Sequence, residues 1–416
     1  MVRLASGTAI AQAIVIFASP ILTRLYTPAD FGVLSLFVAM IAVVGVVAGL
    51  RYELALPIAS NNEDAVALVV LGFTFTLITS LLVWIILLIV WEPIELTFDL
   101  EPLRAYKWMI PVGIASIGIF NILTLWGTRE QMYGLLARSK LTQGMGIVST
   151  QIGIGLLATG GLGLIAGDVF GRLLAALYLG RQIGGKHVRK IRSLDYHAFK
   201  SVLVRFRRFP LLSAPASFFN VLGLRLPVVL VAGFYGIEAA GWLMLSQMLV
   251  GGPMTLIGQS VSRVYSGELG HRRRENPASM ESLFLKMTSK LALYCTLPIL
   301  LLAIVAPMAF EWIFGQNWYT AGLYTRLLAL MLIAQIIVSP VASTLTLLER
   351  QDLQLMWDVV RVIVVGIGFS LAANYGLSDI YALAIYCGLM ILLYVALWYI
   401  SLAQIRCFLL TEDKQH

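Results

Sequence analysis

Long apolar stretches recur along the whole chain and are separated by short polar segments. About 20 consecutive apolar residues form a helix that crosses the ~30 Å hydrocarbon core of a bilayer, so these stretches predict membrane-spanning helices. They place twelve spans, at 5–25, 32–51, 65–91, 106–126, 142–159, 162–180, 209–233, 239–262, 289–310, 322–345, 356–373 and 379–402. The pattern therefore predicts an all-α integral membrane protein with 12 transmembrane helices.

Composition supports this architecture. Of the 416 residues, 59% are hydrophobic and only 12% are charged, whereas soluble domains carry about 25% charged residues. This shortage of charge excludes soluble enzymes, nucleic-acid-binding modules and disordered scaffolds. The net charge of +8 does not indicate a nucleic-acid partner, because the basic residues lie in short connections between spans and not along one exposed face.

The basic residues predict how the chain is oriented. With a cytoplasmic N-terminus, 23 of the 30 Lys and Arg residues lie in cytoplasmic segments, four lie outside and three lie within spans. The positive-inside rule therefore predicts that both termini are cytoplasmic. The first span begins almost at Met1 without a cleavage pattern of small residues, which favours a retained helix over a signal peptide.

A basic connection over residues 181–208 divides the spans into two sets of six. This predicts an N-terminal six-helix lobe over 1–180, a basic cytoplasmic linker over 181–208, a C-terminal six-helix lobe over 209–402 and a cytoplasmic tail over 403–416. The halves resemble a repeat, because Tyr26 and Gly32 recur as Tyr235 and Gly241 with one offset of 209 residues. A duplicated unit of this kind predicts pseudo-twofold symmetry around a central cavity.

The chain lacks the motifs of a reactive centre. The four histidines are scattered along the predicted cytoplasmic segments and form no cluster with Cys or carboxylate residues, so we predict no metal and no cofactor. The run GGLGLIAGDVFG follows no strand, which argues against a dinucleotide loop; its glycines Gly163, Gly167 and Gly171 instead suit close helix packing. The external connections are too short to hold a glycosyl-transfer site, so the sequence favours a transporter over an enzyme.

Arginines within or at the ends of the spans are the most informative residues. Arg225 lies deep in the span 209–233 with no acidic residue within one turn, and an arginine at mid-bilayer costs at least ~2.5–3.5 kcal/mol, so it usually faces a cavity or a partner. Together with Arg24, Arg51 and Arg263, it predicts a cavity that binds an anion. Guanidinium groups grip phosphate bidentately, so a lipid-linked phosphate is the expected anion. Snorkelling to the head-group layer is the alternative for these arginines.

Acidic residues near the spans are candidates for ion coupling. Asp168 and Arg172 lie four residues apart, and Asp358 and Arg361 three residues apart, so each pair can neutralise itself on one helix. Most such pairs are structural, but a minority carry protons or sodium ions, and Asp168, Arg172 and Glu53 are the candidates here. Coupling to H+, to Na+ or to the membrane potential stays open at this stage.

Several stretches resemble a known family. RFPLLSAPAS, FYG and PMTLIGQ occur in this order before Leu269, and SPILTRLYTPADFGVLSLFVAM and RYELALPIA occur in the first 60 residues. Together they resemble the Wzx-type polysaccharide repeat-unit flippases of bacteria, in the multidrug/oligosaccharidyl-lipid/polysaccharide exporter superfamily. The resemblance implies a V-shaped bundle of two six-helix lobes, with a central cavity lined by the first, second, seventh and eighth spans, which carry the four arginines.

The resemblance also implies the substrate and its route. The family turns undecaprenyl-pyrophosphate-linked oligosaccharides from the cytoplasmic to the periplasmic leaflet of the bacterial inner membrane by alternating access, for O-antigen or another surface polysaccharide. Tyr26, Asn220 and Gln247 are then expected to contact the sugars, or else to serve in helix packing. Besides the lipid bilayer, a polysaccharide polymerase and a chain-length regulator are the expected partners.

Rival functions remain open. A cation-coupled multidrug exporter of the same superfamily would depend on Asp168 or Glu53, although a cationic cavity disfavours cationic drugs. A flippase for the peptidoglycan precursor generally carries two further C-terminal spans, for which we find no counterpart. A glycosyl-transfer enzyme would show polymerising activity when purified.

Overall fold

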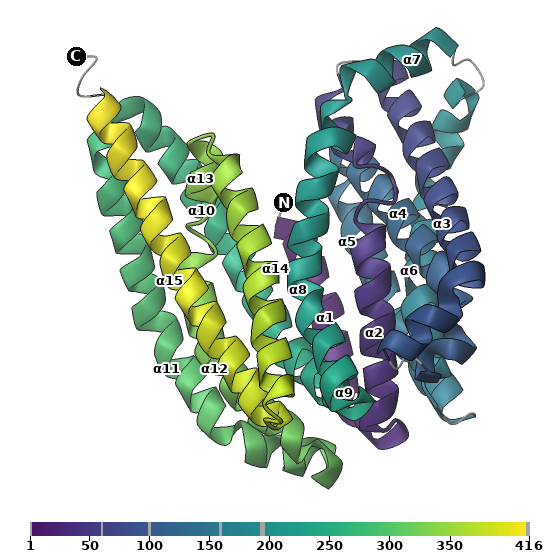
Figure 1. Ribbon diagram of the computed structural model, residues 1–416. Helices are drawn as coiled ribbons and strands as arrows, with labels where there is room; N and C mark the ends of the chain where they lie inside the picture. Colours follow the sequence, from purple (N-terminus) through teal and green to yellow (C-terminus); the bar gives the residue numbers. More distant parts are fainter. Residues whose placement is uncertain (1, 60, 99–100, 158–159, 192–195, 413–416) are drawn as a thin grey trace. The chain divides into compact units, whose positions relative to one another are not determined.

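The computed structural model describes residues 2–59, 61–98, 101–157, 160–191 and 196–412, and the regular elements within them are all helical (Figure 1). The predicted linker and tail therefore lie partly outside the described residues, at 192–195 and 413–416. Contacts between Cα atoms divide the chain into two compact units, Met1–Gly241 and Trp242–His416. The first unit thus takes in α8, the helix that carries Arg225.

The elements of the first unit are α1 (Val2–Leu25), α2 (Pro28–Gly45), η1 (Tyr52–Ile58), α3 (Asn62–Phe98), η2 (Glu101–Tyr106), α4 (Met109–Arg129), α5 (Tyr133–Gly155), α6 (Leu162–Ile191), α7 (Tyr196–Arg205), η3 (Phe209–Ser213), α8 (Ala214–Tyr235) and the start of α9 (Ile237–Ser246). Helix α5 packs against α1 and α6, and α4 packs against α2, α3 and α6. Helix α8 packs on α2, which is why it belongs to this unit.

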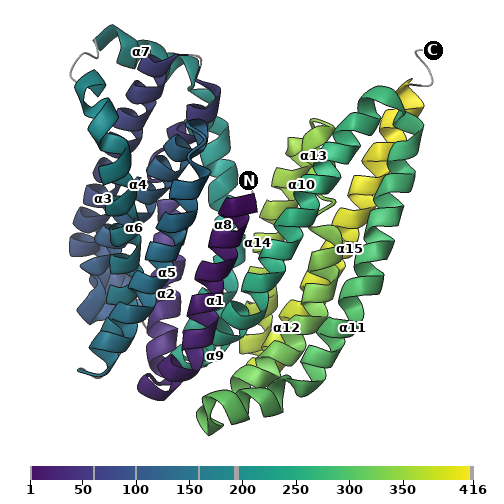
Figure 2. The same cartoon turned by 180° about the vertical axis from the view of Figure 1, so that it is seen from behind.

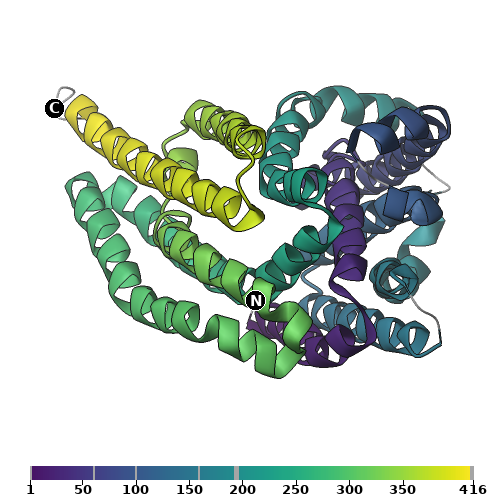
Figure 3. The same ribbon diagram turned by 60° about the horizontal axis from the view of Figure 1, so that its bottom comes forward.

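The second unit contains the rest of α9, η4 (Gln247–Gly251), α10 (Gly252–Glu275), η5 (Pro277–Ser279), α11 (Met280–Phe314), η6 (Gln316–Trp318), α12 (Tyr319–Val338), α13 (Ser343–Leu347), α14 (Gln351–Asn374) and α15 (Asp379–Glu412). Helix α11 packs along α12, and α15 packs against both α12 and α14 (Figures 2 and 3). The segment η4 is a π-helical turn that leads directly into α10.

Eleven of the described helical runs are long and apolar enough to cross a membrane. Each coincides with one of the twelve predicted spans. The remaining predicted span, 142–159, falls largely on α5, which has 23 residues but is too polar to be among the eleven. The twelfth span therefore stays a prediction. Helix α6 extends to Ile191, well beyond the predicted end of its span.

The described part of the predicted linker is docked on the first unit. Val202 and Phe206, in and just after α7, are buried in an apolar cluster with residues of η1, α3 and α4. Arg205 pairs with Asp64 at 2.9 Å, and the Tyr52 hydroxyl donates a hydrogen bond to the Leu203 carbonyl at 3.4 Å. This segment therefore packs against η1 and α3 and does not serve only as a basic connection between the two sets of spans.

Small residues bring α5 and α6 close together, as the glycine spacing predicts. A Cβ atom at Gly167 would lie 2.9 Å from the carbonyl oxygen of Ile147, and one at Gly171 would lie 2.7 Å from the amide nitrogen of Ile147. Neither position has room for a side chain. The predicted packing role of these two glycines is confirmed, and it holds α6 in register with α5.

The repeat register reappears where α2 and α9 begin. These helices start at Pro28 and Ile237, which differ by the same offset of 209 residues. A Cβ atom at Gly32 would collide with the Ile237 carbonyl, and one at Gly241 would collide with the Pro28 carbonyl. The contact is therefore reciprocal, because each glycine receives the first carbonyl of the other helix.

Alanine at either crossing glycine should destabilise the protein. A methyl group at position 32 or 241 would meet backbone, which cannot rotate away, so we expect Gly32→Ala and Gly241→Ala each to cost at least ~1–3 kcal/mol. Thermal unfolding of the purified variants in detergent measures the loss. The matched control is Gly233→Ala, where nothing lies within 4 Å of the new atom; an equal melting temperature for all three variants would contradict the crossing.

Candidate functional site

Charged side chains of three helices gather inside the first unit. The Arg172 Nη2 atom donates to the Asp168 Oδ1 atom at 2.7 Å, with side chains 17% and 12% exposed, which confirms the pair predicted from their spacing. Arg225 of α8 interacts electrostatically with both of these residues. Lys140 of α5 interacts with Arg172 in the same way. We call these four residues the cationic cluster.

The cationic cluster is unbalanced, since it contains three cations and one carboxylate. Within the described residues, Arg225 makes no hydrogen bond or ion pair, and it is half-buried. The Asp168 Oδ2 and Arg172 Nε atoms are buried without a hydrogen-bond partner. Polar groups in a water-poor interior are costly unless they are paired. The cluster is therefore suited to accept an anion that supplies the missing negative charge.

Sequence reasoning missed Lys140, because hydropathy placed it in a cytoplasmic connection. In the structure it lies within α5, with its ammonium group 4.4 Å from the centroid of the Phe120 ring and within hydrogen-bond distance, 3.3 Å, of the Gln143 side-chain oxygen. Only its proximity to Arg172 reveals its place in the cluster. The one clue in the sequence was that a lysine precedes a glycine-rich span, which is too common to be informative.

The other predicted arginines lie outside this cluster. Arg24, at the end of α1, and Arg263, on α10 of the second unit, are both exposed and unpaired within the described residues. Arg51 precedes η1 in a left-handed conformation (φ 62°) and lies 3.7 Å from the Glu53 carboxylate. Arg51 thus lies within 4 Å of a carboxylate, whereas Arg225 forms no ion pair in the part of the chain that the structure describes.

The residues expected to contact sugars differ in their surroundings. Tyr26 is only 3% exposed, and its hydroxyl donates to the Gln151 carbonyl at 2.6 Å. Asn220 is half-buried on α8, five residues before Arg225. Gln247 is half-buried at the start of η4 in the second unit. Tyr26 serves in packing here, and its contact with sugar stays a prediction.

Glu53 is a buried carboxyl at the start of η1. Its side chain is 5% exposed, and its Oε2 atom has no hydrogen-bond partner and faces Gly49, where a Cβ atom would lie only 2.8 Å away. Burial raises the pKa of Glu53, while the Arg51 guanidinium opposes that rise. Glu53 can therefore hold a proton at a higher pH than an exposed carboxyl does.

Comparison with known proteins places this arrangement in a family. Residues 21–323 match the profile of a family described as polysaccharide biosynthesis protein. The chain belongs to this family. It is 30% identical over 158 residues to the teichuronic acid biosynthesis protein TuaB of Bacillus subtilis (strain 168), a match that covers 38% of this chain and 32% of TuaB. The match thus spans about a third of that relative's length.

Solved structures show the fold. A multidrug resistance MATE family transporter of the MOP superfamily, in its inward-facing conformation, matches with a TM-score of 0.72 at 14% identity, covering 97% of this chain and 96% of that one. The lipid II flippase MurJ, in an inward closed conformation, matches with a TM-score of 0.69 at 12% identity, covering 96% and 87%. The chain therefore has the fold of these two proteins, and its long apolar helices make it a multi-pass membrane protein.

Removing only the Asp168 carboxylate should lower the stability of the folded protein more than removing Asp168 and Arg172 together. Asp168→Ala leaves Arg172 buried without its partner and next to other cations, so we expect a loss of ~3–5 kcal/mol. The double variant Asp168→Ala/Arg172→Ala removes the stranded charge and should recover much of that loss. Thermal unfolding in detergent measures both.

An exposed pair provides the control for this comparison. Arg350 and Asp352 lie 3.2 Å apart with side chains 41% and 62% exposed, so Asp352→Ala should leave the melting temperature almost unchanged. If the double variant melts no higher than Asp168→Ala, the unpaired charge of Arg172 is not what destabilises the single variant, and the prediction is wrong.

The raised pKa of Glu53 predicts a pH dependence of stability. A carboxyl whose pKa is higher in the folded than in the unfolded state stabilises the fold at low pH and loses that contribution as the pH rises through the folded value. The melting temperature of the wild type should therefore fall relative to that of Glu53→Gln as the pH is raised from the ordinary carboxyl pKa of 4.5 toward neutrality. Parallel pH profiles for the two proteins would show that Glu53 does not titrate this way.

Proposed function

We propose that this chain is a flippase that moves undecaprenyl-pyrophosphate-linked oligosaccharide repeat units from the cytoplasmic to the periplasmic leaflet by alternating access. The observation that carries the proposal is the unpaired Arg225 beside the Asp168–Arg172 pair. A pyrophosphate supplies the negative charge that the cluster lacks, and guanidinium groups bind phosphate oxygens in a bidentate manner. The family's description as polysaccharide biosynthesis protein supports a glycan as the rest of the ligand.

Each residue of the cationic cluster has a distinct part in this proposal. Arg225 makes the primary contact with the pyrophosphate, because its guanidinium forms no hydrogen bond or ion pair among the described residues. Lys140 adds positive charge, while Asp168 holds Arg172 through the 2.7 Å hydrogen bond and so limits the excess of cations when no ligand is bound. The polyprenyl chain stays in the lipid, where its apolar surface needs no binding site.

The wider architecture is part of the proposal. Twelve spans form two six-helix lobes with pseudo-twofold symmetry and a central cavity, in a bacterial inner membrane with both termini in the cytoplasm. Arg24, Arg51 and Arg263 would meet the head group along its route, and Asn220 and Gln247 would contact the sugars. A polysaccharide polymerase and a chain-length regulator would act on the exported unit, in the synthesis of O-antigen or another surface polysaccharide.

Two similar proteins lend support through their names. TuaB is described as a teichuronic acid biosynthesis protein, which favours a glycan, and MurJ as a lipid II flippase, which favours a lipid-linked substrate. For energy coupling we propose that Glu53 or Asp168 carries H+ or Na+. Glu53 is the stronger choice, because Asp168 is already engaged by Arg172.

Loss of the Arg225 guanidinium should abolish transport without loss of the protein. In a producing strain that depends on this chain, Arg225→Ala should eliminate surface polysaccharide and leave lipid-linked repeat units inside, because the pyrophosphate loses its main contact. Arg225→Lys should retain part of the activity, since it keeps the charge but not the bidentate geometry. Surface polysaccharide is measured by gel and immunoblot, and protein by its amount in the membrane fraction.

The matched control is Arg207→Ala, which removes an exposed arginine and should leave surface polysaccharide unchanged. Normal surface polysaccharide with Arg225→Ala would overturn the proposal. Efflux of cationic drugs that depends on Asp168 or Glu53, with no effect on polysaccharide, would instead favour a multidrug exporter, to which the MATE-like fold is equally suited.

A further inference from the structure

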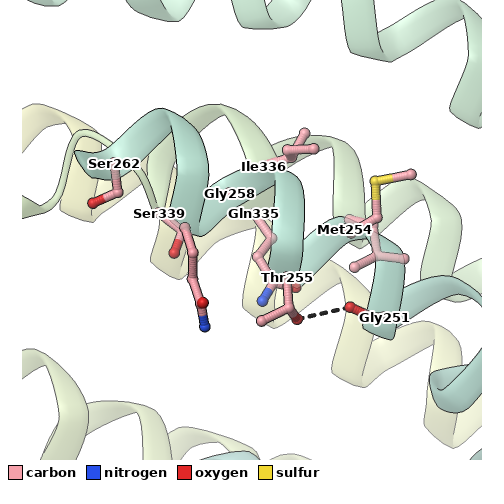
Figure 4. A pocket seen from close by; sticks show the side chains of 10 residues that line it. Gly251, Met254, Thr255, Gly258, Ser262, Gln335, Ile336 and Ser339 are labelled. Atoms are coloured by element: carbon pink, nitrogen blue, oxygen red, sulfur yellow. Dashed lines mark hydrogen bonds between the residues drawn. The ribbon is translucent and has the colours of Figure 1, made fainter. Parts of the chain in front are cut away.

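A cavity of about 280 Å³ lies between α10 and α12 in the second unit. From the α10 side it is lined by residues spaced three and four apart from Gly251 to Ser262, and from the α12 side by residues in the same spacing from Leu332 to Ser339. These residues form one face of each helix. Figure 4 shows Thr255 and Gln335 directed toward the same open side of the helix pair.

The cavity is polar but carries no charged side chain. Its hydrogen-bonding groups are two amides and three hydroxyls, contributed by Thr255, Gln259, Ser262, Gln335 and Ser339. The Thr255 hydroxyl donates to the Gly251 carbonyl at 2.7 Å and keeps its lone pairs free. Within the described residues, the side-chain amides of Gln259 and Gln335 make no hydrogen bond. The cavity thus offers both donors and acceptors to a ligand.

Such a lining is costly for a helix that crosses a membrane. Polar side chains in the hydrocarbon region normally face a partner or an aqueous cavity. The described residues of α10 that are buried in the protein are Tyr265 and Leu269, which lie beyond the cavity toward the end of the helix. Packing inside the second unit therefore does not explain the polar stripe from Thr255 to Ser262.

The chemistry of the lining selects the class of ligand. The lining contains no carboxylate, guanidinium or ammonium group, so a charged ligand would find no counter-charge there. Amides and hydroxyls suit a neutral ligand that both donates and accepts hydrogen bonds. Met254, Leu332 and Ile336 complete the lining and provide apolar contact for C–H surfaces. A sugar ring combines hydroxyls at its edge with C–H groups on its faces.

We infer that this cavity is a glycan subsite, which binds an uncharged sugar of the transported unit. The inference rests on the proposed function and assigns the sugar and the pyrophosphate to different sites. Ligand pockets commonly measure ~300–1,000 Å³, so the cavity holds a fragment of the oligosaccharide and not the whole unit. Gln335 and Gln259 are the specificity-determining residues, because each can engage two neighbouring hydroxyl groups.

Binding to two lipids separates the subsite from the pyrophosphate site. The purified protein in detergent is titrated with the lipid-linked repeat unit from the producing strain and with undecaprenyl pyrophosphate that carries no sugar. The wild type should bind the sugar-bearing lipid about tenfold more tightly. Gln335→Met, which preserves side-chain length, should weaken binding of that lipid about three- to tenfold and leave binding of the sugar-free lipid unchanged.

The controls distinguish every outcome. Gln351→Met, at an exposed position on α14, should change neither affinity, and Arg225→Ala should weaken both. Equal affinity of the wild type for the two lipids would overturn the subsite and leave the proposed function intact. An equal loss for both lipids with Gln335→Met would also overturn it. If the wild type binds neither lipid, the proposed function fails and the subsite fails with it.

Discussion

Charge inside a membrane protein must be compensated, and the interior of the first unit compensates it only in part. The Asp168 carboxylate pairs with Arg172 on its own helix. Arg225 on α8 and Lys140 on α5 form no ion pair with any described acidic residue. The apolar packing around them makes each unpaired charge more costly than it would be in water. Binding of an anion would therefore stabilise this unit, because the anion supplies the negative charge that the cationic cluster lacks.

The two units differ in the chemistry that they offer. The first unit provides several positive charges on closely packed helices. The glycines of α6 hold α5 and α6 in register. The second provides neutral amides and hydroxyls along a polar helix face. A lipid-linked glycan has the same division, with a doubly charged head and uncharged sugars. If the chain transports such a lipid, as we propose, the carrier and the sugar are recognised by different chemistries.

The sequence predicted what depends on local spacing. The spans follow from hydropathy, and the Asp168–Arg172 pair follows from a separation of one helical turn. The sequence did not predict which helices are neighbours. Arg225 was therefore assigned to substrate binding and Asp168 to ion coupling, although the two residues interact. For the same reason Lys140 was placed in a cytoplasmic connection between spans. Packing of α7 on η1 and α3 was missed for the same reason, because basic residues dominate that segment and conceal Val202 and Phe206. The hydrogen bond from the Tyr26 hydroxyl to the Gln151 carbonyl of α5 also could not be predicted, because no spacing rule indicates it.

The reciprocal contact between α2 and α9 has the geometry of a twofold interface. Residue 32 meets residue 237 as residue 241 meets residue 28, which is the self-complementary form of an interface between two identical subunits related by a twofold axis. The same small residue thus opens both sides of the contact. A larger side chain at one glycine would disrupt one side and leave the other intact, so the contact has two independent points of failure.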